Sequence, residues 1–159
     1  MYTLLVIDMQ TKFLNRFDSY EIKNEVIFRC RQAVLKAIAD GAEIIEVKYV
    51  GTDGNLDYYG NTIEEISNLW KQYKKYFPSA VKTVYKKDDG GGEEVLQAKP
   101  QYEDLIVCGI NLGACVGETV YQLRKHKQNV RIIQEAVANS WGERSSCDVL
   151  YKDIYVNLP

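Results

Sequence analysis

The chain has 159 residues and a formal net charge of -2, with acidic and basic residues scattered along its length. This length is typical of one domain with its own hydrophobic core, so we expect a single domain over residues 1–159 and one functional site. No basic stripe suits nucleic acid or an anionic membrane surface, so neither is an expected partner. The apolar runs are too short to cross a bilayer and no signal segment opens the chain, which predicts a soluble, cytoplasmic protein.

The chain begins with a predicted strand, helix and strand. Residues 2–7 are apolar and β-branched, which is typical of a strand buried on both faces of a parallel sheet, and Asp8 follows at its carboxyl end. Residues 21–40 carry apolar side chains at helical spacing, and Gly41 stands where a helix commonly ends. Residues 43–50 are predicted to form the second strand.

A loop rich in Gly, Asp, Asn and Tyr is predicted at residues 51–61. The pair Thr62 and Glu65 has the spacing of a capping box, which predicts that the next helix begins there. A third strand is predicted at residues 81–85, followed by a flexible acidic and glycine-rich loop at residues 88–92.

The rest of the chain continues the alternation of helices and strands. Further helices are predicted at residues 93–99, 114–126 and 145–153, and further strands at residues 105–108, 130–134 and 154–158. Strands that alternate with helices imply an α/β fold of three layers, with a doubly wound, mainly parallel, Rossmann-like sheet. Ligands bind such sheets beyond the carboxyl ends of the strands, near the switch in strand order.

Cys115 is the first candidate for a chemical role, because it falls where the fourth strand turns into a helix. Backbone N–H groups and the helix dipole at such a position favour a thiolate. The alternative is that Cys115 is a small buried apolar residue. The sole histidine, His126, lies about three turns along the same helix and is too far away to act as the base. Asp8 is the first candidate base, since its strand ends on the same rim; an aspartate that serves only a loop or a helix cap is the alternative.

Several segments, in this order, resemble the isochorismatase-like (cysteine hydrolase) family over nearly the whole chain. They are Leu4-Leu5-Val6-Ile7-Asp8-Met9-Gln10 with Phe13, Val84-Tyr85-Lys86-Lys87, Leu105-Ile106-Val107-Cys108-Gly109-Ile110, Cys115-Val116 with Thr119, and Ile132-Ile133-Gln134-Glu135-Ala136-Val137-Ala138. The resemblance implies a catalytic triad of Asp8, Lys87 and Cys115, with Lys86 as the alternative lysine. For either lysine, a solvated charge at the end of a strand is the other interpretation.

The resemblance also implies a cis peptide bond between Ile110 and Asn111. In this arrangement the N–H groups of Asn111 and Cys115 form an oxyanion hole, whereas an ordinary tight turn is the alternative. Phe13 and Trp141 are the candidate substrate-binding aromatic residues, and either is equally suited to the core.

The function expected from this resemblance is hydrolysis of a small amide, ureide or N-carbamoyl compound through a thioester intermediate. The alternative is an inactive binding or interaction protein of the same fold, because Leu112 and residues 91–93 depart from the family pattern. No metal and no cofactor is expected, since residues 51–61 contain no histidine. The expected partners are a small-molecule substrate and further copies of the chain in a homo-oligomer. Cys115 is expected to be the one unusually acidic thiol.

Overall fold

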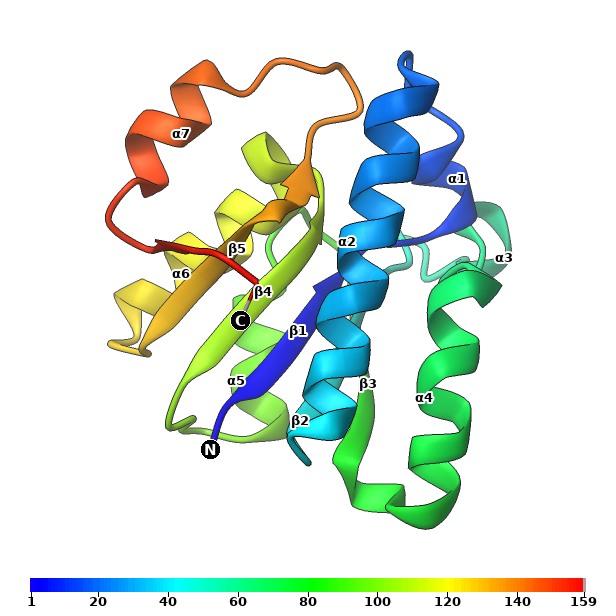
Figure 1. Cartoon of the computed structure of the whole chain (residues 1–159), viewed down its shortest axis with the longest axis vertical. Coiled ribbons are helices and arrows are strands. Elements are labelled where there is room, and N and C mark those ends of the chain that lie inside the picture. Colours follow the sequence, from blue (N-terminus) through cyan, green and yellow to red (C-terminus); the bar gives the residue numbers. More distant parts are fainter. Residues whose placement is uncertain (159) are drawn as a thin grey trace.

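A six-stranded sheet forms the centre of the protein, with strand order β3-β2-β1-β4-β5-β6 and parallel neighbours throughout (Figure 1). The computed structural model describes residues 1–158, apart from the side chains of Ser145, Ser146 and Val149. The strands are β1 (Thr3–Ile7), β2 (Glu43–Tyr49), β3 (Val81–Lys86), β4 (Leu105–Ile110), β5 (Val130–Ala138) and β6 (Tyr155–Val156).

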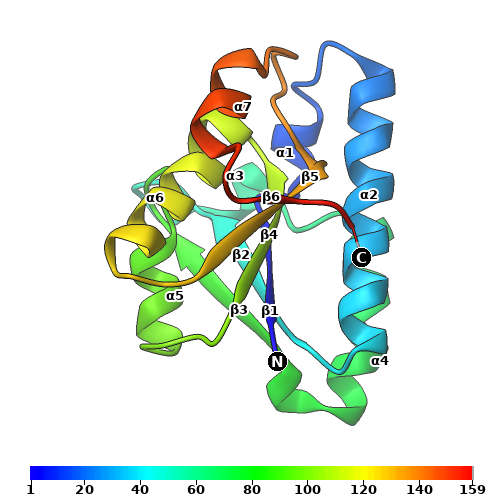
Figure 2. The ribbon, with the colours of Figure 1, turned by 60° about the vertical axis from the view of Figure 1, so that its left-hand side comes forward.

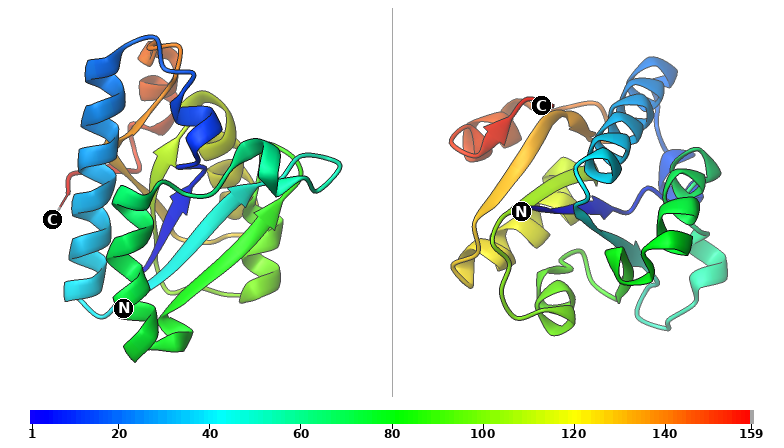
Figure 3. Two further views of the ribbon diagram at one scale, coloured as in Figure 1. Left: turned by 90° about the vertical axis from the view of Figure 1, so that its right-hand side faces the viewer. Right: turned by 60° about the horizontal axis from the view of Figure 1, so that its bottom comes forward.

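Helices cover both faces of this sheet, which confirms the predicted three-layer, doubly wound α/β fold. α2 and α4 lie on one face, and α5 and α6 on the other (Figure 2, Figure 3). The helices are α1 (Thr11–Leu14), α2 (Tyr20–Ala39), α3 (Leu56–Tyr59), α4 (Glu64–Tyr76), α5 (Gly92–Ala98), α6 (Gly117–Lys125) and α7 (Ser145–Tyr151). Each face has its own apolar cluster, because the strands present buried side chains in both directions. In the described part of the chain, no helix is both long and apolar enough to cross a membrane.

The predicted elements occur in the predicted order, but their ends differ. β4 and β5 extend to Ile110 and Ala138, beyond the predicted ends, and the predicted helix at residue 114 begins as a π-helical turn over Leu112–Val116. The predicted capping box is wrong: α4 begins at Glu64, and no side chain caps it. The backbone of Thr62 instead pairs with Gln10 in an isolated antiparallel bridge, so Thr62 lies outside the helix.

β1 lies at the switch in strand order, and this position determines where a site can form. All five β1 residues are buried, and β1 pairs with β2 on one side and β4 on the other. After β1, the chain adds β2 and β3 on one side of this strand and then β4, β5 and β6 on its other side. The connections therefore diverge at the carboxyl ends of β1 and β4. Side chains that follow these strands therefore meet at one rim of the sheet.

Gly109 lets β4 approach β1 closely just before this rim. Its φ is +127°, and a Cβ atom there would lie 2.1 Å from the carbonyl oxygen of Ile7. We expect Gly109→Ala to lower the free energy of unfolding by about 4 kcal/mol or more, since backbone must move to admit the methyl group. Gly41→Ala is the matched control, because Gly41 has a φ of +68° with open space around it, and its cost should be about 1 kcal/mol. Urea unfolding of both variants measures the difference; equal losses would contradict the close approach.

Candidate active site

Asp8 is the first residue after β1 and lies at the centre of the rim. Its φ is +52°, a left-handed conformation that aspartate tolerates better than most residues. Its backbone N–H donates to the carbonyl of Val47 at 3.0 Å, so the turn is attached to β2. The side chain is 1% exposed. A carboxyl group buried this deeply requires a partner or a function.

Lys86, the last residue of β3, is the lysine that reaches Asp8. It is fully buried, and its Nζ lies 2.9 Å from Asp8 Oδ2. Nζ also donates to the backbone carbonyls of Asp88 at 3.1 Å and Asp89 at 2.7 Å. The prediction that Lys87 lies beside Asp8 is wrong: Lys87 is exposed and follows the end of the strand. Side chains alternate along a strand, so Lys86 shares the inward face with Val84.

The loop after β3 folds closely over the Lys86 side chain. Its Gly91 has no room for a side chain, since a Cβ atom there would lie 2.9 Å from Lys86 Cδ. The N–H of Gly91 donates to Thr119 Oγ1 at 2.9 Å, and the N–H of Gly92 donates to Gln122 Oε1 at 2.8 Å. Two α6 side chains therefore hold the loop in place, and the glycines predicted as a flexible segment serve close packing.

Cys115 lies in the π-helical turn between β4 and α6 and is 7% exposed. Its thiol faces Asp8, and the two groups affect each other. Burial and the Asp8 charge raise the pKa of Cys115 to about 12, although Lys86 opposes this shift. The prediction of an unusually acidic thiol is therefore wrong, because it took account of the helix terminus and the lysine but neglected the cost of burying a charge.

The pKa of the Asp8 carboxyl is also raised from its ordinary value of 3.8. Burial is the main cause, and Lys86 and the Cys115 thiol offset it only in part. Neither carboxylate oxygen has a well-aligned hydrogen-bond donor among the described residues. Asp8 is thus a buried carboxylate of increased basicity whose oxygens remain available to accept a proton from Cys115.

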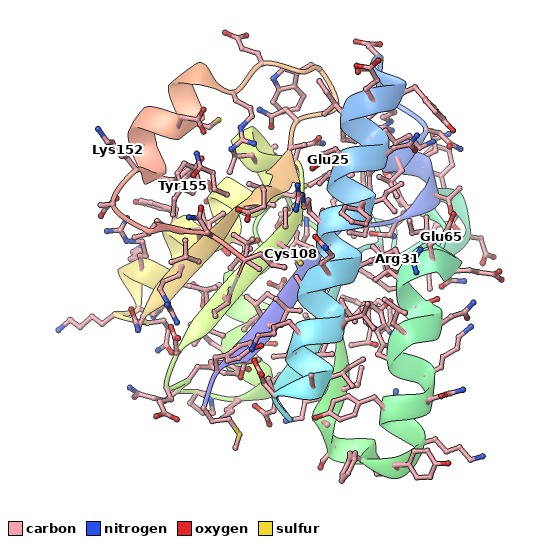
Figure 4. The ribbon with its side chains drawn as sticks, in the orientation of Figure 1. Glu25, Arg31, Glu65, Cys108, Lys152 and Tyr155 are labelled. Atoms are coloured by element: carbon pink, nitrogen blue, oxygen red, sulfur yellow. The ribbon has the colours of Figure 1, made fainter. Side chains whose placement is uncertain are left out.

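The other cysteines have surroundings that suit a packing role. Cys30 and Cys108 are fully buried, and Cys108 lies in the centre of the sheet (Figure 4). Burial raises the pKa of Cys30 well above its ordinary value. Cys147 is 7% exposed and packs in the same apolar cluster as Cys115. Burial alone therefore does not distinguish Cys115; its contact with Asp8 does.

The peptide bond between Ile110 and Asn111 is cis, as the resemblance implied. The Asn111 carbonyl accepts hydrogen bonds from the N–H groups of Ala114 at 3.1 Å and Val116 at 3.0 Å. The N–H of Cys115 lies between these two donors in the sequence and is not one of the donors to that carbonyl in the described residues. A role for the Asn111 and Cys115 N–H groups as an oxyanion hole stays a prediction.

Two aromatic residues predicted to line the substrate site are placed differently. Phe13 is 7% exposed and packs against Tyr49 and Tyr59, with ring centroids 5.7 Å and 5.6 Å away. Trp141 is half exposed and lies against the Cys115 turn: a Cβ atom on Gly113 would meet its Cζ2 at 3.0 Å. Phe13 therefore supports the site from within the core, and Trp141 lies at its outer side.

Tyr49 and Gln10 contribute to the site although neither was singled out from the sequence. Lys86 Nζ lies 4.9 Å from the centroid of the Tyr49 ring, within range of a cation–π contact. The fully buried Gln10 side chain donates to the Tyr49 carbonyl at 3.0 Å and accepts from its N–H at 2.8 Å. The same amide also donates to the carbonyl of Gly60 at 2.8 Å, so Gln10 joins the end of β2 to the loop that follows it.

Two surface hollows flank the buried cluster. The larger hollow has a volume of about 700 Å³, lies along α6 and α7, and is lined by Ala114, Glu118 and Tyr121. The smaller hollow has a volume of about 430 Å³ and is lined by Tyr49 and Glu118. Asp8, Lys86 and Cys115 line neither hollow, but their chain neighbours Ala114 and Lys87 each line one. Among the residues whose side chains are described, no group of three metal-binding side chains occurs.

Comparison with known proteins agrees with this fold. A sequence profile of the isochorismatase domain matches residues 2–146. A relative from Xenopus laevis, isochorismatase domain-containing protein 2, is 26% identical over 148 residues, which cover 93% of this chain and 63% of that protein. The chain thus spans less than two thirds of this relative's length.

Two solved structures share the fold at low sequence identity. The MAR1 ribonuclease of Caenorhabditis elegans has a TM-score of 0.75 and 18% identity, with 96% of this chain and 71% of that chain covered. The N-carbamoylsarcosine amidase of Thermoplasma acidophilum has a TM-score of 0.71 and 13% identity, with 99% and 96% covered. Because the sequence profile covers most of the chain, the protein belongs to the isochorismatase family.

Proposed function

We propose that the protein is a cysteine-dependent hydrolase that cleaves a C–N bond of a small amide, ureide or N-carbamoyl compound. The observation that carries the proposal is the buried cluster of Asp8, Lys86 and Cys115 at the switch in strand order. A nucleophile beside a base that is itself held by a third group is the arrangement that nucleophilic catalysis requires. The shared fold with an N-carbamoylsarcosine amidase supports the substrate class.

The first step is attack by Cys115 sulfur on the carbonyl carbon of the substrate. Because the pKa of this thiol is about 12, it is protonated at neutral pH and attacks as its proton moves to Asp8. The raised pKa of Asp8 makes it a stronger base than an ordinary carboxylate. The N–H groups of Asn111 and Cys115 hold the resulting oxyanion, and each donor of this kind contributes about 3 kcal/mol.

The second step releases the amine and the third restores the enzyme. Asp8 returns the proton to the leaving nitrogen as the C–N bond breaks, which leaves a thioester on Cys115. Asp8 then takes a proton from water as the water oxygen attacks the thioester carbonyl, and it passes that proton to the Cys115 sulfur as the C–S bond breaks and the acid is released. Lys86 holds the Asp8 carboxylate in place and keeps enough of it ionised for these transfers.

The experiment that tests this proposal is a panel of small amides, ureides and N-carbamoyl compounds, with ammonia release as the readout. We expect at least one class to be turned over, and the activity to disappear in Cys115→Ala. No ammonia release from any class would overturn the proposed function and favour the inactive binding protein of the same fold.

The pH dependence of the reaction follows from the raised pKa of Asp8. The ionised carboxylate is the base, so we expect kcat/KM to rise with pH through an acid limb that lies above the ordinary carboxyl value of 3.8. Stability has the opposite sign: a folded pKa above the unfolded value means that ionisation of Asp8 destabilises the fold as pH rises through that pKa. Kinetics and urea unfolding across pH 4 to 8 measure both. An acid limb near the ordinary carboxyl value would contradict the buried base.

We also propose that the protein is cytoplasmic and forms a homo-oligomer. Tyr58 and Tyr76 are exposed, as expected for residues at an interface between copies, whereas Tyr59 packs against Phe13. Light scattering at micromolar protein tests the assembly, and a monomer mass would overturn it.

A further inference from the structure

Two carboxylates, those of Asp89 and Glu118, line both hollows above the cluster. Asp89 is exposed, and among the described side chains no cation forms an ion pair with it. Its backbone is fixed, because its carbonyl accepts the 2.7 Å hydrogen bond from Lys86 Nζ. The Asp89 backbone is therefore held beside the proposed catalytic lysine, and Asp89 lines both hollows.

The charge of Asp89 reaches the reacting groups. Burial is the main cause of the raised pKa values of Asp8, Cys115 and Tyr49, and the Asp89 charge adds a smaller upward contribution to each. A substrate charge placed between Asp89 and Cys115 would experience the same field at shorter range. The field of the Asp89 charge is stronger there than in bulk water, because Asp8 and Cys115 are buried.

Basic side chains stand at the other end of the larger hollow. Arg124 and Lys125 line it near the end of α6, and Arg124 pairs with Asp153 at 3.3 Å. Glu118 and Lys125 are seven positions apart in α6, which corresponds to about 10 Å along the helix axis. Lys87 lines only the smaller hollow. The end of the larger hollow nearest Cys115 is consequently acidic, with the tyrosine ring of Tyr121 in its wall.

We propose that Asp89 is a specificity-determining residue that selects amides with a positive charge close to the scissile carbonyl and disfavours amides with a negative charge there. This inference rests on the proposed function and names the substrate class within it. An ammonium or guanidinium group next to the reacting carbonyl would lie by the Asp89 carboxylate and against tyrosine, both of which attract cations. A carboxylate in the same place would be repelled by Asp89 and by Glu118.

Charged thiol reagents test the field at Cys115 without requiring turnover. The probes are 2-aminoethyl methanethiosulfonate, which is cationic, and 2-sulfonatoethyl methanethiosulfonate, which is anionic; the modified peptide is identified by mass. We expect the cationic probe to modify Cys115 faster, and Asp89→Asn to reduce the ratio of the two rates roughly tenfold. Glu65→Gln is the matched control, since it removes one exposed negative charge at the start of α4 (Figure 4), and Glu65 lines neither hollow. A ratio that Asp89→Asn leaves unchanged would overturn the inference.

A matched set of amides then tests specificity in turnover. Glycinamide carries a cation next to the carbonyl, propionamide is neutral, and malonamate carries an anion. We expect kcat/KM to decrease in that order, and Asp89→Asn to remove most of the difference between glycinamide and malonamate. Hydrolysis with no dependence on charge would overturn the inference and retain the proposed function. If no amide were hydrolysed but Asp89→Asn still reduced the ratio of the two modification rates, the proposed function would be overturned. The electrostatic role of Asp89 would be retained.

Discussion

Cys115→Ala is expected to reduce hydrolysis by about 10⁴-fold or more, because the nucleophile itself is lost. Cys115→Ser should be almost as inactive, since a serine hydroxyl is far less acidic than a thiol and Asp8 is only a carboxylate base. Both variants should stay folded: the side chain is small, and loss of one sulfur atom costs about 1 kcal/mol. Steady-state ammonia release and urea unfolding measure the two effects.

Cys147→Ala is the matched control for this substitution. Cys147 and Cys115 are equally buried, each 7% exposed, and belong to the same apolar cluster. Burial and Asp8 together raise the pKa of the Cys115 thiol. Cys147, in contrast, is not among the groups that affect the pKa of Asp8. The control should retain most of its activity. Similar losses in the two variants would mean that packing, not nucleophilic attack, explains the effect.

Lys86→Met is expected to reduce kcat/KM by about 10² to 10³-fold at neutral pH, while Lys87→Met leaves it nearly unchanged. Lys86 is fully buried against Asp8, and its removal leaves a buried carboxyl with no cation. The pKa of Asp8 then rises further, so less of the base is ionised at pH 7. The activity that remains should require a higher pH than in the unmodified protein. A pH profile of both variants measures this displacement.

The two lysines should also differ in their effect on stability. Breaking a buried ion pair costs about 3 to 5 kcal/mol, and protonation of Asp8 in the variant reduces that cost. Lys87 is exposed, and its replacement should change the free energy of unfolding by less than about 0.5 kcal/mol. If Lys87→Met were the inactive variant and Lys86→Met the active one, the buried Lys86 at the end of β3 would have no role in catalysis.

The order of elements was predictable from the sequence because buried parallel strands are short apolar runs. β1 and β4 have this pattern, and both end where a chemically active side chain follows. Asp8 was predicted at the rim for this reason. The lysine was not, because two lysines follow each other and a difference of one residue reverses the direction of a side chain. The structure distinguishes them, because Lys86 is buried against Asp8 at the end of β3 whereas Lys87 is exposed.

The electrostatics of the site could not be predicted in the same way. A helix terminus and a lysine near Cys115 indicated an acidic thiol, but the pKa depends on burial, and burial is a property of the whole packed layer. The same applies to Gln10 and Tyr49, whose contacts join β1, β2 and β3 across long stretches of chain. Asp89 was assigned to a flexible loop, and its hydrogen bond with Lys86 depends on the close packing that Gly91 permits.

The most direct test of the central claim is the mass of the enzyme during turnover. A substrate found in the panel is mixed with the protein, the reaction is stopped with acid within milliseconds to seconds, and the modified peptide is identified by mass. We expect an added acyl group on the peptide that contains Cys115, and hydroxylamine should remove it because the bond is a thioester. Turnover with Cys115 unmodified at every time point, together with full activity in Cys115→Ala, would contradict the central claim.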